Sequence, residues 1–134
     1  MSTRLTFDTE AILAFYLGET GGEIVKDNLI EIQNGTVEGY INIINLTELY
    51  YILSRIDSKL AEEKQKNLRL YGLKVVSVTD NGLWREAALI KSKHSLSLVD
   101  AFAVATAKNL KSILVVGSDQ EFTNMDIKLK RIRG

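Results

Sequence analysis

The sequence predicts an α/β protein with a central, mostly parallel sheet of four or five strands flanked by helices. Short β-branched runs alternate with helix-length segments that carry apolar stripes, which is the pattern of βαβ units. The length of 134 residues is that of one domain. The composition, 46% hydrophobic and 25% charged, is typical of globular proteins rather than disordered ones. We therefore expect one domain over residues 1–134.

In the first half of the chain, the pattern predicts two strands and four helices. The first strand alternates in polarity up to Asp8, and the second is a β-branched run. Two apolar helices follow the first strand, and each ends at a glycine. Asn45 and Ser58 are predicted N-caps of the next two helices, and Gly72 ends the later one. The predicted elements are strand 4–7, helix 9–17, helix 20–33, strand 40–44, helix 46–56 and helix 58–71.

In the second half, the pattern predicts three strands and two helices. Asp80 and Asn81 are predicted to open the first of these helices, and Ser97 caps the second. Small apolar residues in the second helix allow it to pack closely on a sheet. The run before Gly117 is the strongest strand signal in the chain. The predicted elements are strand 73–78, helix 80–90, helix 98–110, strand 112–116 and edge strand 127–130.

Composition limits the chemistry that the chain can perform. Lys and Arg together number 17, as do Asp and Glu, so no overall positive field binds polyanions. The absence of cysteine excludes disulfides, thiolate catalysis and Cys-ligated metal sites. One histidine, His94, excludes a His-rich metal site. Polar chemistry must therefore come mainly from carboxylates, hydroxyls, amides, Lys and Arg.

The sequence also bears on location. No apolar run of signal-peptide length precedes Asp8, and no stretch approaches the roughly 20 apolar residues that span a bilayer. We expect a cytoplasmic protein that does not associate with membranes.

Four acids are predicted to meet at one edge of the sheet. Asp8 and Asp119 follow strands, Glu48 lies in the first turn of the helix after the second strand, and Asp100 opens the helix before strand 112–116. Open α/β sheets bind ligands at the carboxyl ends of their strands. Apolar residues flank each of these acids in the sequence. A carboxylate buried in such surroundings must protonate, pair with a cation or hold a metal, and few cations are nearby in sequence. Clustered carboxylates suit Mg²⁺ or Mn²⁺ and phosphoryl chemistry.

Taken singly, each acid also has a structural interpretation. Asp8 is a natural helix N-cap, and Asp119 is a natural turn residue. Glu48 follows Asn45, and Asp100 follows Ser97, by the three residues of a capping box. These alternatives stay open for each acid alone, whereas four acids at one edge favour a shared site.

Four phrases of the sequence resemble the PIN-domain ribonucleases, in that family's order and over essentially the whole chain. The nearest likeness in outline is to the small VapC-type toxins of toxin–antitoxin pairs. The resemblance implies a Rossmann-like PIN domain that uses Mg²⁺ or Mn²⁺ to cleave RNA endonucleolytically, with single-stranded RNA as the expected substrate. An antitoxin protein and a second copy of the chain are the implied protein partners. The phrases are Asp8-Thr9 before Ile12-Leu13, Asn45-Leu46-Thr47-Glu48-Leu49, Leu98-Val99-Asp100-Ala101, and Leu114 to Phe122.

The resemblance also implies residue roles. The catalytic and metal-binding acids are Asp8, Glu48, Asp100 and Asp119. Glu121 lies where many members have a further Asp and is a candidate fifth ligand, and Thr9 matches a small hydroxyl residue that often follows the first acid. Many members carry Ser or Thr two positions before the last acid, where this chain has Gly117; Ser118 is the candidate replacement for that hydroxyl.

Other features suggest contacts with partners. Lys91 and Lys93, beside His94, are candidates for RNA phosphate contacts or belong to a solvated face. Residues 128–133 form a second basic group, which is expected to protect a sheet edge or, alternatively, to contact RNA phosphates. An apolar face is expected to dock a partner helix or a second copy. It comprises Leu46, Leu49, Tyr50 and Leu53.

Two other functions remain open. The departure at Gly117 is compatible with a catalytically inactive PIN-like RNA-binding or scaffolding module. A phosphoacceptor domain that uses Asp8 is weaker, because the second acid and the lysine which that chemistry needs are missing.

Overall fold

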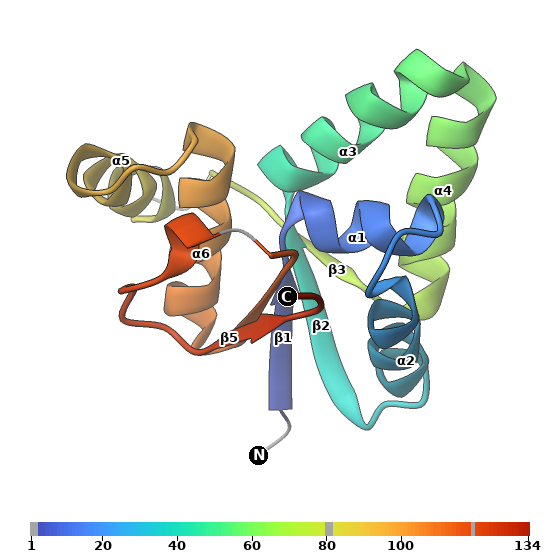
Figure 1. Cartoon of the computed structure of the whole chain (residues 1–134), viewed down its shortest axis with the longest axis horizontal. Helices are drawn as coiled ribbons and strands as arrows, with labels where there is room; N and C mark the ends of the chain where they lie inside the picture. Colours follow the sequence, from blue (N-terminus) through green and yellow to red (C-terminus); the bar gives the residue numbers. More distant parts are fainter. Residues whose placement is uncertain (1–2, 80–81, 119) are drawn as a thin grey trace.

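Five strands and six α-helices make up the part of the chain that the computed structural model describes, residues 3–79, 82–118 and 120–134 (Figure 1). The predicted α/β class is confirmed. In order, the elements are β1 (Thr3–Phe7), α1 (Thr9–Tyr16), α2 (Gly22–Gln33), β2 (Val37–Asn42), α3 (Ile43–Ile56), α4 (Ser58–Tyr71), β3 (Lys74–Val76), α5 (Leu83–Lys93), α6 (Leu98–Leu110), β4 (Ile113–Val116), a 3₁₀ turn η1 (Gln120–Phe122) and β5 (Leu129–Arg131).

The strands form one parallel sheet in the order β3-β2-β1-β4-β5. The central strand β1 pairs with β2 from Thr3 opposite Val37, and with β4 up to Phe7 opposite Val115. Because all strands run the same way, their carboxyl ends meet at one edge of the sheet. This edge is at the top in Figure 1, where β1 leads into α1.

Helices cover both faces of the sheet and create two cores. In Figure 1, α1, α2 and α4 lie to one side of the sheet, and α5 and α6 lie to the other. Successive residues of β4 serve opposite cores, as the period of two in a strand requires. Val115 packs in the first core, with Phe7 and Leu53, whereas Leu114 and Val116 pack in the second.

Two predicted helix caps are wrong. The β-branched run was predicted to be strand to residue 44, but β2 ends at Asn42 and Ile43 begins α3. Asn42 is the N-cap, since its Oδ1 accepts from the Ile44 N–H at 2.8 Å. Asn45 therefore lies inside the first turn of α3. Likewise Asp57, not Ser58, caps α4.

The shift at α3 also moves Glu48. With α3 beginning at Ile43, Glu48 falls in the second turn and is not part of a capping box with Asn45. The predicted cap at Ser97 is confirmed, because its Oγ accepts from the Asp100 N–H at 3.0 Å. Asp80 and Asn81 lie outside the described residues. Smaller shifts affect α2, which begins at residue 22, β3, which spans 74–76, and β5, which spans 129–131.

Buried polar contacts join the sheet to α6. Asn42 Nδ2 donates to Thr106 Oγ1 at 2.8 Å, and the Thr106 hydroxyl donates to the Phe102 carbonyl at 2.7 Å. The hydroxyls of Thr6 and Ser112 share a hydrogen bond of 2.6 Å. Satisfied buried groups of this kind hold one arrangement of helix and strand, because an unpaired buried polar group is costly.

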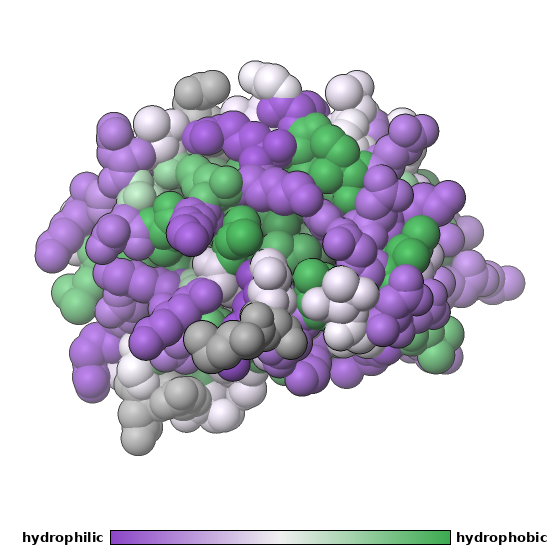
Figure 2. Space-filling view, turned by 90° about the horizontal axis from the view of Figure 1, so that it is seen from below, coloured by the Kyte–Doolittle hydropathy of each residue, from purple (hydrophilic) through white to green (hydrophobic). Residues whose placement is uncertain are grey.

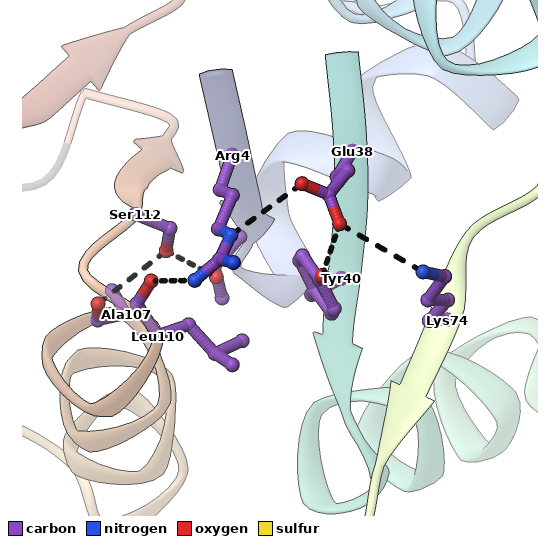
Figure 3. Close-up of polar contacts among 8 residues, drawn as sticks. Arg4, Glu38, Tyr40, Lys74, Ala107, Leu110 and Ser112 are labelled. Carbon is purple, nitrogen blue, oxygen red and sulfur yellow. Dashed lines mark hydrogen bonds and ion pairs between the residues drawn. The ribbon is translucent and has the colours of Figure 1, made fainter. Parts of the chain in front are cut away.

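At the opposite edge of the sheet, three side chains contact the carboxylate of Glu38 (Figure 3). Tyr40 OH donates to Glu38 Oε1 at 2.9 Å, while Arg4 Nε and Lys74 Nζ lie 3.5 and 3.8 Å from its oxygens. The Tyr40 hydroxyl, followed by the Arg4 and Lys74 charges, holds the pKa of the Glu38 carboxyl below its ordinary value. Arg4 also donates to the Leu110 carbonyl at 3.1 Å, which ties β1 to the end of α6.

Figure 2 views the molecule from this opposite edge, and hydrophilic residues cover most of the face around smaller hydrophobic areas. An open cavity of about 760 Å³ lies there, lined by cations such as Arg4, Lys111 and Lys128 beside Glu38 and Asp126. The cavity is at the far end of the strands from the predicted acids. Within the described ranges, none of the helices has the length and apolar character that a bilayer span requires.

One prediction concerns Tyr16, which joins α1 to α4. Its hydroxyl donates to Asn67 Oδ1 at 2.7 Å, and burial, with Tyr71 nearby, raises the pKa of Tyr16 above its ordinary value. The unfolded chain then loses this proton first, so the stability from Tyr16 is complete below about pH 10 and is lost as the pH rises above it. Tyr16→Phe should flatten the alkaline fall in the free energy of unfolding, measured by urea denaturation at several pH values. A fall as steep as that of wild type would contradict this, and the exposed Tyr51→Phe is the control.

Candidate metal and catalytic site

Asp8 lies at the carboxyl end of the central strand. Its backbone N–H donates to the Val115 carbonyl at 3.0 Å, which extends the pairing of β1 with β4 by one residue. The side chain is only 2% exposed. Its Oδ1 accepts from the Ala11 N–H at 2.8 Å and so caps α1. The cap interpretation is confirmed. Because a carboxylate has about four lone-pair sites, capping a helix does not exclude binding a metal.

The residue after Asp8 ties α1 to α3. Thr9 Oγ1 donates to the Asn45 carbonyl at 3.2 Å, and Asn45 Nδ2 donates back to Thr9 Oγ1 at 3.3 Å. Asn45 is fully buried, and its side-chain Oδ1 has no hydrogen-bond partner among the residues of the described ranges. A buried oxygen left without a partner in the residue that contacts Thr9 fits a site that takes a polar or cationic group.

Glu48 and Asp100 lie on α3 and α6, and the hydrogen bond between Asn42 and Thr106 joins α6 to the residue that caps α3. α6 leads into β4 and so begins at the edge where β1, β2 and β4 end. Glu48 is six residues after Asn42, and Asp100 is six residues before Thr106, so each lies about 9 Å along its helix from that bond. Both side chains are partly buried.

The remaining predicted site residues follow β4. Ser118 comes two residues after Val116 and is partly buried, and Glu121 is an exposed residue of η1. Asp119, the fourth predicted acid, lies outside the described residues. In ranges 3–79, 82–118 and 120–134, no three Asp, Glu or His side chains form a group that could hold one metal ion. The four-acid site therefore stays a prediction, of which the structure describes three members.

Three helix N-termini contribute partial positive charge to this edge. The N-termini of α1, α3 and α6 begin there, capped by Asp8, Asn42 and Ser97. Each helix N-terminus carries roughly half a positive charge, which favours anions nearby. Carboxylates and an approaching phosphate are both suited to this position.

Two lysines lie beside the edge. Lys91 and Lys93 are exposed in the last turn of α5, and His94 is the exposed residue that ends the helix. Only residues 94–97 separate α5 from α6, so the lysines are close in the chain to the helix that carries Asp100. The other basic group lies on and around the edge strand β5. There Lys130 donates to Asn28 Oδ1 at 3.0 Å.

The expected docking face needs a correction. Leu46, Leu49 and Leu53 are at most 7% exposed and pack in the first core, so they cannot form an exposed face. Only Tyr50 of the predicted set is exposed, at 39%, and its hydroxyl donates to Glu62 Oε2 at 2.9 Å. The outer side of α3 instead carries a shallow groove of about 360 Å³ that Ile43, Tyr50 and Tyr51 help to line.

Sequence reasoning missed the role of Asn45, because it assigned this residue to a cap. The signal that could have found it is an Asn within a helix, where this residue type is unfavourable unless its side chain has a specific contact. It also missed the contact of Glu10 with Arg133, whose Nη2 donates to Glu10 Oε1 from 123 positions later in the chain.

Comparison with known proteins identifies one family and several similar structures, three of which follow. The PIN-domain family model matches residues 5–128. A toxin–antitoxin complex from Klebsiella pneumoniae is 14% identical, with a TM-score of 0.72, and covers 96% of this chain and 97% of that chain. VapBC2 from Rickettsia felis, bound to a promoter DNA fragment, is 15% identical, with a TM-score of 0.72 and coverage of 96% and 98%. DNA-bound VapBC from Salmonella typhimurium is 14% identical, with a TM-score of 0.73 and coverage of 97% and 98%. Comparison with curated proteins found no match.

Proposed function

The chain belongs to the PIN-domain family, and we propose that it is a divalent-metal-dependent endoribonuclease that acts as the toxin of a toxin–antitoxin pair. The observation that carries the proposal is the position of Asp8. A carboxylate that is 2% exposed lies at the carboxyl end of the central strand, where three helix N-termini also begin. The same edge receives the helices that carry Glu48 and Asp100.

These residues fit a hard divalent cation. Asp8, Glu48, Asp100 and Asp119 would hold Mg²⁺ or Mn²⁺, with Glu121 as a candidate fifth ligand, because carboxylate oxygens are the ligands these ions prefer. When bound, the ion supplies Lewis-acid stabilisation of the phosphoryl charge and lowers the pKa of water. The orphaned Asn45 Oδ1 next to Thr9 is consistent with a polar occupant of this region.

Side chains of the protein would orient the water, hold the spacing of the acids and contact the RNA. Glu48 orients the attacking water, and the Thr9–Asn45 hydrogen bonds keep the start of α1 against α3 so that Asp8 and Glu48 hold their spacing. Lys91 and Lys93 contact phosphates of single-stranded RNA, as exposed lysines do through charge. Hydrolysis on this scheme leaves a 5′-phosphate on the product, as the family resemblance implies.

The partner proposal rests on the structural neighbours. One of the three compared structures is a toxin–antitoxin complex, and the other two are VapBC structures bound to DNA. We propose that this chain likewise pairs with an antitoxin protein and also forms a homodimer. Size-exclusion chromatography with light scattering should give twice the monomer mass of 15.0 kDa for the chain alone. A monomer across the micromolar range would contradict the homodimer.

An RNA-binding or scaffolding module without catalysis is the second candidate. Gly117 favours it, since the resemblance expects a hydroxyl residue there. Incubation of the purified chain with single-stranded RNA in Mg²⁺, in Mn²⁺ and in EDTA separates the two. Cleavage in either metal but not in EDTA supports the nuclease, and binding without cleavage in every condition supports the module.

Metal binding should also stabilise the fold. Carboxylates that converge without a cation repel one another, and a ligand at 100 times its Kd adds about 2.7 kcal/mol to the free energy of unfolding. We expect Mg²⁺ or Mn²⁺ to raise the Tm of wild type more than that of Asp100→Asn. Asp27→Asn, an exposed change in α2, is the matched control and should keep the full shift. Equal shifts in wild type and Asp100→Asn would count against a shared site.

A further inference from the structure

Gly117, the position where the chain departs from the family pattern, is closed off by Glu10. A Cβ added to Gly117 would lie 2.4 Å from Glu10 Cδ and 2.5 and 2.8 Å from the two carboxylate oxygens. The φ angle of Gly117 lies outside the left-handed region, so its backbone conformation does not require glycine. A side chain at 117 would meet the carboxylate of Glu10, which fills the space beside the Gly117 Cα.

Glu10 cannot move aside without losing a partner. Arg133 Nη2 donates to Glu10 Oε1, and its Nη1 donates to the Thr20 carbonyl at 3.0 Å and lies 3.9 Å from Glu19 Oε1. The Arg133 side chain is only 21% exposed. Its position is fixed by the preceding residue, because the Ile132 N–H donates to the Val116 carbonyl at 3.0 Å. The last turn of the chain therefore holds Glu10 against the end of β4.

This contact joins the two segments that carry the first and last predicted acids. Glu10 lies two residues after Asp8, in the first turn of α1, and Gly117 lies two residues before Asp119. A carboxylate clamped between Arg133 and Gly117 limits how closely the end of β4 approaches α1. It occupies the place where a Ser or Thr side chain at 117 would project.

On the basis of the proposed function, we propose that Glu10, clamped by Arg133, is a positioning residue of the candidate site. It substitutes for a side chain at 117 and sets the point at which the chain leaves β4 toward Asp119. Gly117 and Glu10 are then a complementary pair, in which each residue is tolerated because of the other.

The first test is a double-mutant cycle on metal-free protein in EDTA, followed by thermal unfolding. In Gly117→Ala the new methyl displaces Glu10 from Arg133, and in Glu10→Ala the clamp is lost outright, so each should lower the Tm by several degrees. In the double variant the methyl enters the vacated space, so its Tm should equal that of Glu10→Ala or exceed it. Neighbours that share a contact are non-additive in this way. Losses that add in the double variant would overturn the proposal.

The second test asks whether the contact positions the site, using the rise in Tm that saturating Mn²⁺ produces. The shift should fall by at least half in Glu10→Ala and recover in Glu10→Ala/Gly117→Ala. Glu23→Ala is the matched control, since Glu23 is also a first-turn glutamate but opens α2, and it should keep the full shift. An undiminished shift in Glu10→Ala overturns the role of Glu10 alone. No shift in wild type overturns the proposed function, and the positioning role with it.

Discussion

Asp8→Asn should lower divalent-dependent RNA cleavage by a factor on the order of 10² or more while leaving the fold intact. Losing a group that merely supports a metal ligand already lowers activity by roughly 10–100-fold, and Asp8 is proposed as a ligand itself. Asn is as good an N-cap as Asp, so the acceptor for the Ala11 N–H is kept and the charge alone is removed. Initial rates on a labelled single-stranded RNA in Mn²⁺ give the factor.

Two variants keep the Asp8 result interpretable. Asp8→Ala also loses the cap, so its free energy of unfolding should be about 1 kcal/mol lower than that of wild type. This difference separates the structural role of Asp8 from the catalytic one. Asp27→Asn removes an exposed carboxylate from α2 and should cleave at the wild-type rate. A wild-type rate in Asp8→Asn would end the nuclease proposal, because no other described acid is as deeply buried at this edge.

Asn42→Ala should lower the free energy of unfolding by about 2–4 kcal/mol, the largest stability change that we expect from one polar residue. Asn42 is fully buried, caps α3 through Oδ1 and donates through Nδ2 to Thr106. Loss of a cap is worth about 1 kcal/mol, and a broken buried hydrogen bond adds roughly 1–3 kcal/mol. Urea denaturation measures the sum.

The two roles of Asn42 can be separated. Asn42→Ser keeps a capping hydroxyl, but its side chain is too short to reach Thr106. Its free energy of unfolding should therefore lie between the values for wild type and Asn42→Ala. Thr47→Ala, an exposed change in the same helix, should stay within about 0.5 kcal/mol of wild type. Asn42→Ala with wild-type stability would show that the Thr106 bond does not hold α3 to α6.

Elements whose signals were local could be predicted from the sequence. The order of strands and helices, the strand before Gly117 and the cap at Ser97 depend on periodicity and on neighbours within four residues. The boundary at α3 could not be found in this way. Ile43 and Ile44 continue a β-branched run, and their place in the helix is decided by the Asn42 cap and by burial of Leu46 and the residues beyond it.

In the candidate site, too, local features could be predicted and contacts between distant residues could not. Asp8 was predicted both as a helix cap and as a metal ligand; the structure confirms the cap, and the metal role stays a prediction. The contacts of Thr9 with Asn45, and of Glu10 with Arg133, join residues 36 and 123 positions apart, and no local pattern signals them. The leucines of α3 were misjudged because an apolar stripe looks the same whether it faces the protein's own core or a partner.

The central position of β1 has a consequence for biosynthesis. The strand is made long before one of its two neighbours, β4, which begins at Ile113, and the clamp on Glu10 needs Arg133. Contacts so distant along the chain form slowly and late. On the ribosome, residues 113–116 must therefore emerge before β1 is enclosed on both sides, so the edge of the sheet that carries Asp8 cannot be completed earlier.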